Sequence, residues 1–174
     1  MTKDNVILIG MPGSGKSTLG VLLAKAMNYR FLDTDLLIQE SEGMLLSDII
    51  AKIGKDAFVE LEGRINASVE VSRTVIAPGG SAVYSELGMN HFRQLGTVIY
   101  LHVSLDNLKK RLGDLKKRGV ICKEGQTLED IFEERRPYYE KYADIVIDVS
   151  QEGVGEILER IQEELKKKND LENC

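Results

Sequence analysis

One stretch near the start of the chain decides the fold: Val6-Ile7-Leu8-Ile9-Gly10-Met11-Pro12-Gly13-Ser14-Gly15-Lys16-Ser17. Its first four residues form a continuous apolar run, which is typical of a buried parallel strand. Its last eight residues match the pattern G-x-x-x-x-G-K-[ST]. Leucine and alanine side chains then recur with helical spacing over residues 17–27. The stretch therefore predicts a strand, a phosphate-binding loop and a helix, in that order.

The loop at residues 10–17 carries the groups that a nucleotide phosphate requires. Its glycines let the backbone pass close to phosphate oxygens and turn amide N–H groups toward them. The N-terminus of the next helix adds partial positive charge. Lys16 can reach the β- and γ-phosphates, and the Ser17 hydroxyl can ligate Mg²⁺. A chance match in a glycine-rich turn is the alternative, but the strand–loop–helix context favours nucleotide binding.

Short β-rich runs alternate with helical periods along the rest of the chain. Further strands are expected at 30–32, 75–77, 97–102 and 145–147. Helices are expected at 36–42, at 47–73 with a break near Gly54 and Ser47 as a cap, at 84–95, at 105–112, from Thr127 onward, and at 154–168. This alternation implies βαβ units and a mainly parallel sheet covered on both faces. No linker interrupts it, so we expect one domain over residues 1–174.

The composition limits the class of protein. A length of 174 residues fits one domain, and a formal net charge of −5 argues against general nucleic-acid binding. No apolar run approaches the roughly 18 residues that a bilayer span needs. The first residues show no signal-peptide pattern. We therefore expect a cytoplasmic, monomeric enzyme that binds neither nucleic acid nor membrane.

Two carboxylates, Asp33 and Asp35, follow the second expected strand. Ligands of parallel sheets bind beyond this carboxyl edge, and alternation places both side chains on the side of the phosphate loop. One can hold Mg²⁺ or its water shell, while the other orients an acceptor hydroxyl and receives its proton. A solvated strand end, or a helix cap at Asp35, is the alternative. The pattern N-K-x-D is absent, which disfavours a GTPase.

A glycine turn, Pro78-Gly79-Gly80, ends the third expected strand at the same edge. Glycines there permit a substrate to approach backbone N–H groups, although a plain turn is the alternative. The chain resembles the shikimate kinases, small P-loop kinases related to adenylate kinase. Four features carry the resemblance: the phosphate loop, the Asp33-x-Asp35 pair, this glycine turn and the late segment Arg135-Arg136-Pro137-Tyr138-Tyr139. The resemblance covers nearly the whole chain, from the loop at Gly10 to the strand at residue 145.

The resemblance implies a three-layer α/β P-loop kinase fold. Its five-stranded parallel sheet would have the order 2-3-1-4-5, with substrate-binding helices at about 34–73 and a mobile lid at about 113–126. It also implies that ATP, with Mg²⁺, phosphorylates the 3-hydroxyl of shikimate in aromatic amino-acid biosynthesis.

The resemblance also assigns roles to matching residues. Catalysis would fall on Lys16, Asp35 and Arg118. ATP binding would involve Gly13, Ser14, Gly15, Lys16, Ser17, Thr18, Arg111 and Arg118. Substrate binding would involve Asp35, Gly79, Gly80 and Arg135, and the metal would lie at Ser17 and Asp33.

Three arginines have distinct roles in this scheme. Arg118 matches the lid arginine that reaches the phosphates, Arg111 the arginine against adenine, and Arg135 the arginine that binds the substrate carboxylate. A guanidinium fork suits a carboxylate, and a mobile cation suits a transferring phosphoryl group. A solvated helix face is the alternative for each, and Arg136 is an alternative to Arg135.

Three positions depart from the family pattern: Val59 replaces a substrate-binding arginine, Ser81 a third glycine, and Gly119 the proline after the lid arginine. Losing a charged hydrogen bond costs about 1.5–3 kcal/mol. Lys55, one helical turn before Val59, is a better candidate replacement than Arg64. A sister kinase for a sugar acid, polyol or hydroxy amino acid therefore stays an alternative, as does a degenerate nucleotide-binding regulator.

Overall fold

The computed structural model describes residues 3–112, 125–150 and 153–172. Within them, a parallel sheet has the strand order β2-β3-β1-β4-β5. Its strands are β1 (Asn5–Ile9), β2 (Arg30–Asp33), β3 (Thr74–Ala77), β4 (Gly96–His102) and β5 (Ile145–Asp148). The central strand β1 places Val6 opposite Val75 on one side and Thr97 on the other. The predicted α/β class and the order 2-3-1-4-5 are confirmed.

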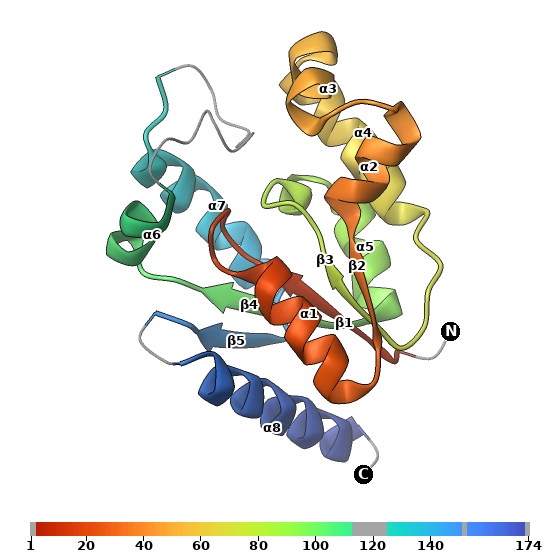
Figure 1. Ribbon diagram of the computed structural model, residues 1–174, viewed down its shortest axis with the longest axis vertical. Coiled ribbons are helices and arrows are strands. Elements are labelled where there is room, and N and C mark those ends of the chain that lie inside the picture. Colours follow the sequence, from red (N-terminus) through yellow and green to blue (C-terminus); the bar gives the residue numbers. More distant parts are fainter. Residues whose placement is uncertain (1–2, 113–124, 151–152, 173–174) are drawn as a thin grey trace.

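Helices cover both faces of this sheet (Figure 1). On one face, α1 (Lys16–Met27) packs on β2 and β3 and contacts α8 (Val154–Glu172), while α5 (Glu86–Leu95) and α7 (Leu128–Tyr142) pack on β4 from the other. Beyond the carboxyl end of β2 lie α2 (Thr34–Glu42), α3 (Leu46–Ile53) and α4 (Lys55–Ala67). The remaining elements are the 3₁₀ turn η1 (Ala82–Tyr84) and α6 (Leu105–Leu112). None of the described helices is long and apolar enough to cross a membrane.

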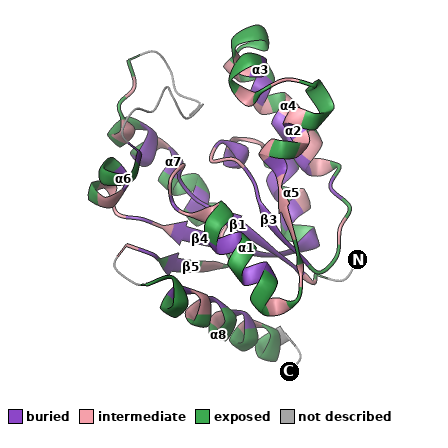
Figure 2. Ribbon diagram, in the orientation of Figure 1, coloured by how far each residue is buried: buried purple, intermediate pink, exposed green. Residues whose placement is uncertain are grey.

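Burial explains why the strands lack polar alternation. Every residue of β1 and β3 is buried, as expected for strands with helices on both faces. Figure 2 shows the buried strands enclosed by helices whose outer faces are exposed. A second, smaller cluster of Ile38, Ile49 and Phe58 joins α2, α3 and α4. The helices beyond β2 therefore have an apolar centre of their own.

The helical stretch expected over residues 47–73 breaks at Gly54 as predicted, into α3 and α4, but the prediction is wrong in two respects. The first is its end, because α4 stops at Ala67. Ser47 is not a cap, because α3 begins at Leu46 with Leu45 at the N-cap position. The chain after α4 cannot stay helical because the Asn5 side chain binds it to the sheet. Its amide donates to the Val71 carbonyl and accepts from the Thr74 N–H, both at 3.0 Å.

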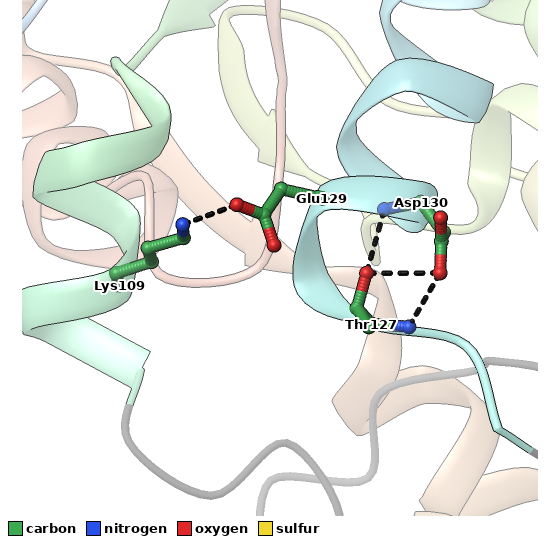
Figure 3. A network of polar contacts seen from close by, with 4 residues as sticks. All are labelled: Lys109, Thr127, Glu129 and Asp130. Atoms are coloured by element: carbon green, nitrogen blue, oxygen red, sulfur yellow. Dashed lines mark hydrogen bonds and ion pairs between the residues drawn. The ribbon is translucent and has the colours of Figure 1, made fainter.

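The helix α7 begins directly after Thr127, where the sequence predicts a helix, and its N-terminus is a capping box. The Thr127 hydroxyl accepts from the Asp130 N–H at 3.2 Å, and the Asp130 carboxylate accepts from the Thr127 N–H at 2.8 Å (Figure 3). Beside this box, Glu129 pairs with Lys109 of α6. Such caps stabilise a helix by about 1 kcal/mol. They fix the start of the helix that carries Arg135.

Candidate active site

The phosphate loop connects β1 to α1 and ends at Gly15. Gly15 has φ +96° at the N-cap of α1, a left-handed conformation that favours glycine. No described side chain caps this N-terminus, and the first turn contains no acidic residue. The first N–H groups of α1 are thus available to an anion, which the helix dipole also favours.

Lys16 bends back over the loop. Its Nζ donates to the carbonyl oxygens of Gly10 and Met11, at 2.9 and 3.0 Å. Burial lowers the pKa of Lys16 to about 8, although the nearby Asp35 carboxylate opposes that shift. The ammonium group lies at the loop, where an added anion would raise its pKa again.

Asp33 links the loop to α2. Its Oδ1 accepts from the N–H of Asp35 at 3.0 Å, which makes Asp33 the cap of α2. Its Oδ2 accepts from the Ser17 hydroxyl at 3.3 Å. The cap is therefore Asp33, so the Asp35 carboxylate is not used for capping. Burial raises the pKa of Asp35 to about 6, with Asp33 adding to the shift and Lys16 opposing it.

One cavity of about 270 Å³ lies between the loop, the end of β3 and α7. Ten of the predicted site residues line it: Gly13, Gly15, Lys16, Ser17, Thr18, Asp33, Asp35, Gly79, Gly80 and Arg135. Ser14 belongs to the loop but is buried and does not line the cavity. Arg111 lies beside the loop, with its Nη1 3.5 Å from the Gly13 carbonyl and its Nη2 3.4 Å from that of Val149. Arg118 and Gly119 lie outside the described residues, as does most of the expected lid at 113–126.

The two adjacent arginines of α7 lie in different surroundings. Arg135 is 1% exposed and lines the cavity. Its Nε donates to the Tyr84 hydroxyl at 3.2 Å. Arg136 lies on the exposed side of α7, where its Nε pairs with Glu140 at 3.4 Å. The guanidinium at the cavity is thus that of Arg135.

Glu62 of α4 is a further carboxylate at this site, and the sequence reasoning assigned it no role. It is fully buried, and its Oε2 accepts from the Ser81 hydroxyl at 2.7 Å. Burial raises its pKa to about 7, the Ser81 hydrogen bond opposes the shift, and Asp35 adds to it. A Cβ atom on Gly79 would lie 2.7 Å from Glu62 Oε1 and 2.7 Å from Asp35 Oδ1. Gly79 therefore separates two carboxylates with no room for a side chain.

The candidate replacements for the missing arginine lie away from the cavity lining. Val59 and Lys55 are half-buried on α4, and Arg64 is exposed. Phe58, next to Val59, contributes to the lining instead. The signal that marks Glu62 was the family segment F-R-x-x-E, in which Glu62 holds the last position.

The loop after the central strand, the paired carboxylates after β2 and the strand order define a P-loop kinase, a phosphotransferase that acts on a hydroxyl group. The family model described as shikimate kinase matches residues 12–166, so the chain belongs to the shikimate kinase family. This membership confirms the family and the enzyme class that the sequence predicts.

Individual relatives agree with this assignment. Shikimate kinase from Sulfurihydrogenibium sp. is 35% identical over 165 residues, which cover 94% of this chain and 99% of the relative. The structure of shikimate kinase from Acinetobacter baumannii in complex with shikimate has a TM-score of 0.85 at 27% identity, covering 96% of this chain and 95% of the other. The structure from Aquifex aeolicus has a TM-score of 0.80 at 30% identity, covering 95% and 98%.

Proposed function

We propose that this chain transfers the γ-phosphoryl group of ATP to the 3-hydroxyl of shikimate. The observation that carries the proposal is a single cavity lined both by the phosphate loop and by Asp35, Gly80 and Arg135. Donor and acceptor would meet beside Asp35. Membership of the family, with a relative of known structure in complex with shikimate, supports this acceptor.

The donor would bind along the loop. The amides of Gly13, Ser14 and Gly15, the side chains of Lys16 and Ser17, and Thr18 would hold the phosphates. Lys16 would exchange its two carbonyl contacts for β- and γ-phosphate oxygens, which are stronger partners because they are charged. The position of Arg111 beside Gly13 and Val149 supports a contact with the adenine.

Ser17 and Asp33 suit Mg²⁺, which accompanies ATP in kinases. Their oxygens already lie 3.3 Å apart at the mouth of the loop. Mg²⁺ prefers hard oxygen ligands and is usually bound by one or two carboxylates together with phosphates and water. When bound there, it would neutralise charge on the β- and γ-phosphates. Removal of divalent ions with EDTA should abolish turnover, and added Mg²⁺ should restore it.

At the acceptor end, Asp35 would act as the base. It would accept the proton of the 3-hydroxyl as the new oxygen–phosphorus bond forms and the bond to the departing ADP oxygen breaks. A pKa of about 6 leaves Asp35 mostly ionised at neutral pH and still able to take a proton. Arg135 would bind the carboxylate of shikimate, and Gly79 and Gly80 would present backbone groups to its ring. Arg118 remains a prediction for the phosphates.

The test is a coupled ADP-release assay with shikimate and a panel of hydroxy acids and polyols. We expect shikimate to be preferred by about 10²-fold or more in kcat/KM. Robust turnover of another acceptor, with negligible use of shikimate, would instead identify a sister kinase. Loss of turnover in Asp35→Asn would exclude a contaminating kinase.

We further propose that the chain acts as one domain, as a monomer and in the cytoplasm. The continuous sheet supports one domain, and the net charge of −5 favours a monomer. Sedimentation at enzyme concentrations used in the assay checks the monomer, because a dimer would double the mass.

A further inference from the structure

Tyr84 lies between a carboxylate and the arginine of the cavity. It ends η1, directly after the glycine turn, and faces α7. Its hydroxyl donates to Glu134 Oε1 at 2.6 Å and accepts from Arg135 Nε at 3.2 Å. The hydroxyl is therefore a bridge between two charged side chains of one helix.

The bridge requires a neutral phenol, which has one proton to donate and lone pairs to accept. Burial raises the pKa of Tyr84, and the hydrogen bond to Glu134 adds to the rise. Tyr84 consequently keeps its proton at neutral pH. Phenylalanine would preserve the ring but supply neither hydrogen bond.

Both partners of the bridge are held from other directions too. Gln126 donates to the second oxygen of Glu134 at 2.8 Å, so the carboxylate is oriented from two sides. The Arg135 guanidinium carbon lies 5.3 Å from the centre of the Tyr84 ring, a cation–π distance. The ring of Tyr138 makes a T-shaped contact with the same ring, with centroids 5.6 Å apart. The Tyr84 ring and hydroxyl thus restrict both the plane of the Arg135 guanidinium and its rotation about the side chain.

The orientation of Arg135 matters because the cavity is narrow beside it. Its Nη1 lies 3.0 Å from the position that a Cβ on Gly80 would take. The Nε edge is bonded to Tyr84, the Tyr139 hydroxyl also hydrogen-bonds the guanidinium, and Nη1 faces the glycine turn. A planar guanidinium must present the correct edge to bind a carboxylate with two hydrogen bonds.

We propose that Tyr84 is a positioning residue for the acceptor: through its bridge from Glu134 it fixes the guanidinium of Arg135 in the orientation that binds the substrate carboxylate. This inference rests on the proposed role of Arg135. Tyr84 itself does not touch the reacting atoms, so its effect falls on substrate binding and not on the transfer step.

The first test is Tyr84→Phe in the steady-state assay. We expect KM for shikimate to rise about tenfold, because Arg135 and Glu134 lose a charge-assisted hydrogen bond, while kcat and KM for ATP stay unchanged. The matched control is Tyr138→Phe, which removes a hydroxyl from the 40% exposed ring neighbour of Tyr84 and should leave both KM values unchanged. An unchanged KM for shikimate in Tyr84→Phe overturns the proposal, as does an equal loss in kcat.

The second test compares shikimate with its neutral carboxamide analogue. Wild-type enzyme should prefer the carboxylate, and Tyr84→Phe should lose about tenfold of that preference, because an uncharged group gains little from an ordered guanidinium. General damage would lower kcat/KM for both acceptors alike, and this result would contradict the positioning role.

These outcomes separate the inference from the proposed function. If wild-type enzyme does not discriminate the carboxylate from the carboxamide, the role of Arg135 is wrong and the inference with it. If wild-type enzyme discriminates and Tyr84→Phe discriminates equally, only the role of Tyr84 is wrong. Should Tyr84→Phe fold poorly in a thermal denaturation experiment, Glu134→Gln provides the second variant. It keeps an acceptor for the phenol but removes the charge, and a smaller rise in KM for shikimate is expected; an unchanged KM overturns the bridge.

Discussion

Replacing Gly79 by alanine would place one methyl group between the two carboxylates of the acceptor site. The new Cβ would lie 2.7 Å from Asp35 Oδ1 and 2.7 Å from Glu62 Oε1, whereas ordinary contacts begin at 3.4 Å. Each carboxylate oxygen would have to retreat by about 0.7 Å, the difference between these distances. Glu62 is fully buried and bonded to Ser81, so we expect Asp35 to move furthest.

The magnitude follows from the sensitivity of catalysis to geometry. A misplacement of about 1 Å can cost about 10²-fold in rate. For Gly79→Ala we therefore expect kcat to fall by about 10- to 10²-fold. The phosphate loop is not touched by the added methyl group, so the affinity for ATP should stay at the wild-type value.

The assay is coupled ADP release at saturating ATP and shikimate, with calorimetry for ATP binding and thermal denaturation as a check on folding. Gly155→Ala is the matched control, because a Cβ at this position of α8 meets no atom within 4 Å. It should leave kcat unchanged. A folded Gly79→Ala variant with wild-type kcat would refute the reasoning, since Asp35 would then tolerate displacement.

Three further predictions concern the same site. Asp35→Asn should lower kcat by about 10²- to 10⁴-fold with little change in ATP affinity. The kcat/KM of the wild-type enzyme should decline below pH 6, because Asp35 becomes protonated there. A pH–rate profile without this decline would show that Asp35 is not the base. Glu62 has a folded-state pKa of about 7 against 4.5, so the folded state binds more protons and stability should fall by up to about 3 kcal/mol as pH rises from 4.5 to 7. Urea unfolding should show a smaller fall in Glu62→Gln than in wild type, because, of these two carboxylates, only Asp35 still contributes; identical slopes would contradict the prediction. Val59→Arg should lower KM for shikimate about tenfold, and no gain would count against shikimate as the acceptor.

The strands could be predicted from sequence because buried parallel strands produce continuous apolar runs, as in β1 and β3. The sheet order came from the resemblance, since apolar runs alone do not specify neighbours. The end of α4 could not be predicted locally. It depends on Asn5, which binds Val71 and Thr74 from more than 60 residues away. The sequence pattern therefore predicts a helix up to residue 73, although α4 ends at Ala67 and the chain then joins the sheet.

The two ends of the cavity differ in how well the sequence predicts them. The donor end is one contiguous motif, because a loop and the helix after it suffice to surround a phosphate. The acceptor end is assembled from α2, α4, the turn after β3 and α7. Glu62 was missed because a single carboxylate on a charged helix is usually solvated. Its burial depends on the glycine turn that packs over it, and apart from its place at the end of the family segment F-R-x-x-E no local pattern indicates that contact.

The two departures at the acceptor end, Val59 and Ser81, converge on Glu62. Val59 is three residues before Glu62 on α4, a spacing at which an arginine could pair with its carboxylate. With valine there, a buried carboxylate still needs a polar partner. The Ser81 hydroxyl is such a partner at 2.7 Å, whereas glycine at this position would have no side chain to donate. The two substitutions are therefore better understood together: the arginine lost at Val59 is replaced, as a partner of the Glu62 carboxylate, by the hydroxyl gained at Ser81. Considered alone, Val59 suggests that the acceptor has changed. Because Ser81 supplies Glu62 with a partner, Val59 is only a weak argument against shikimate.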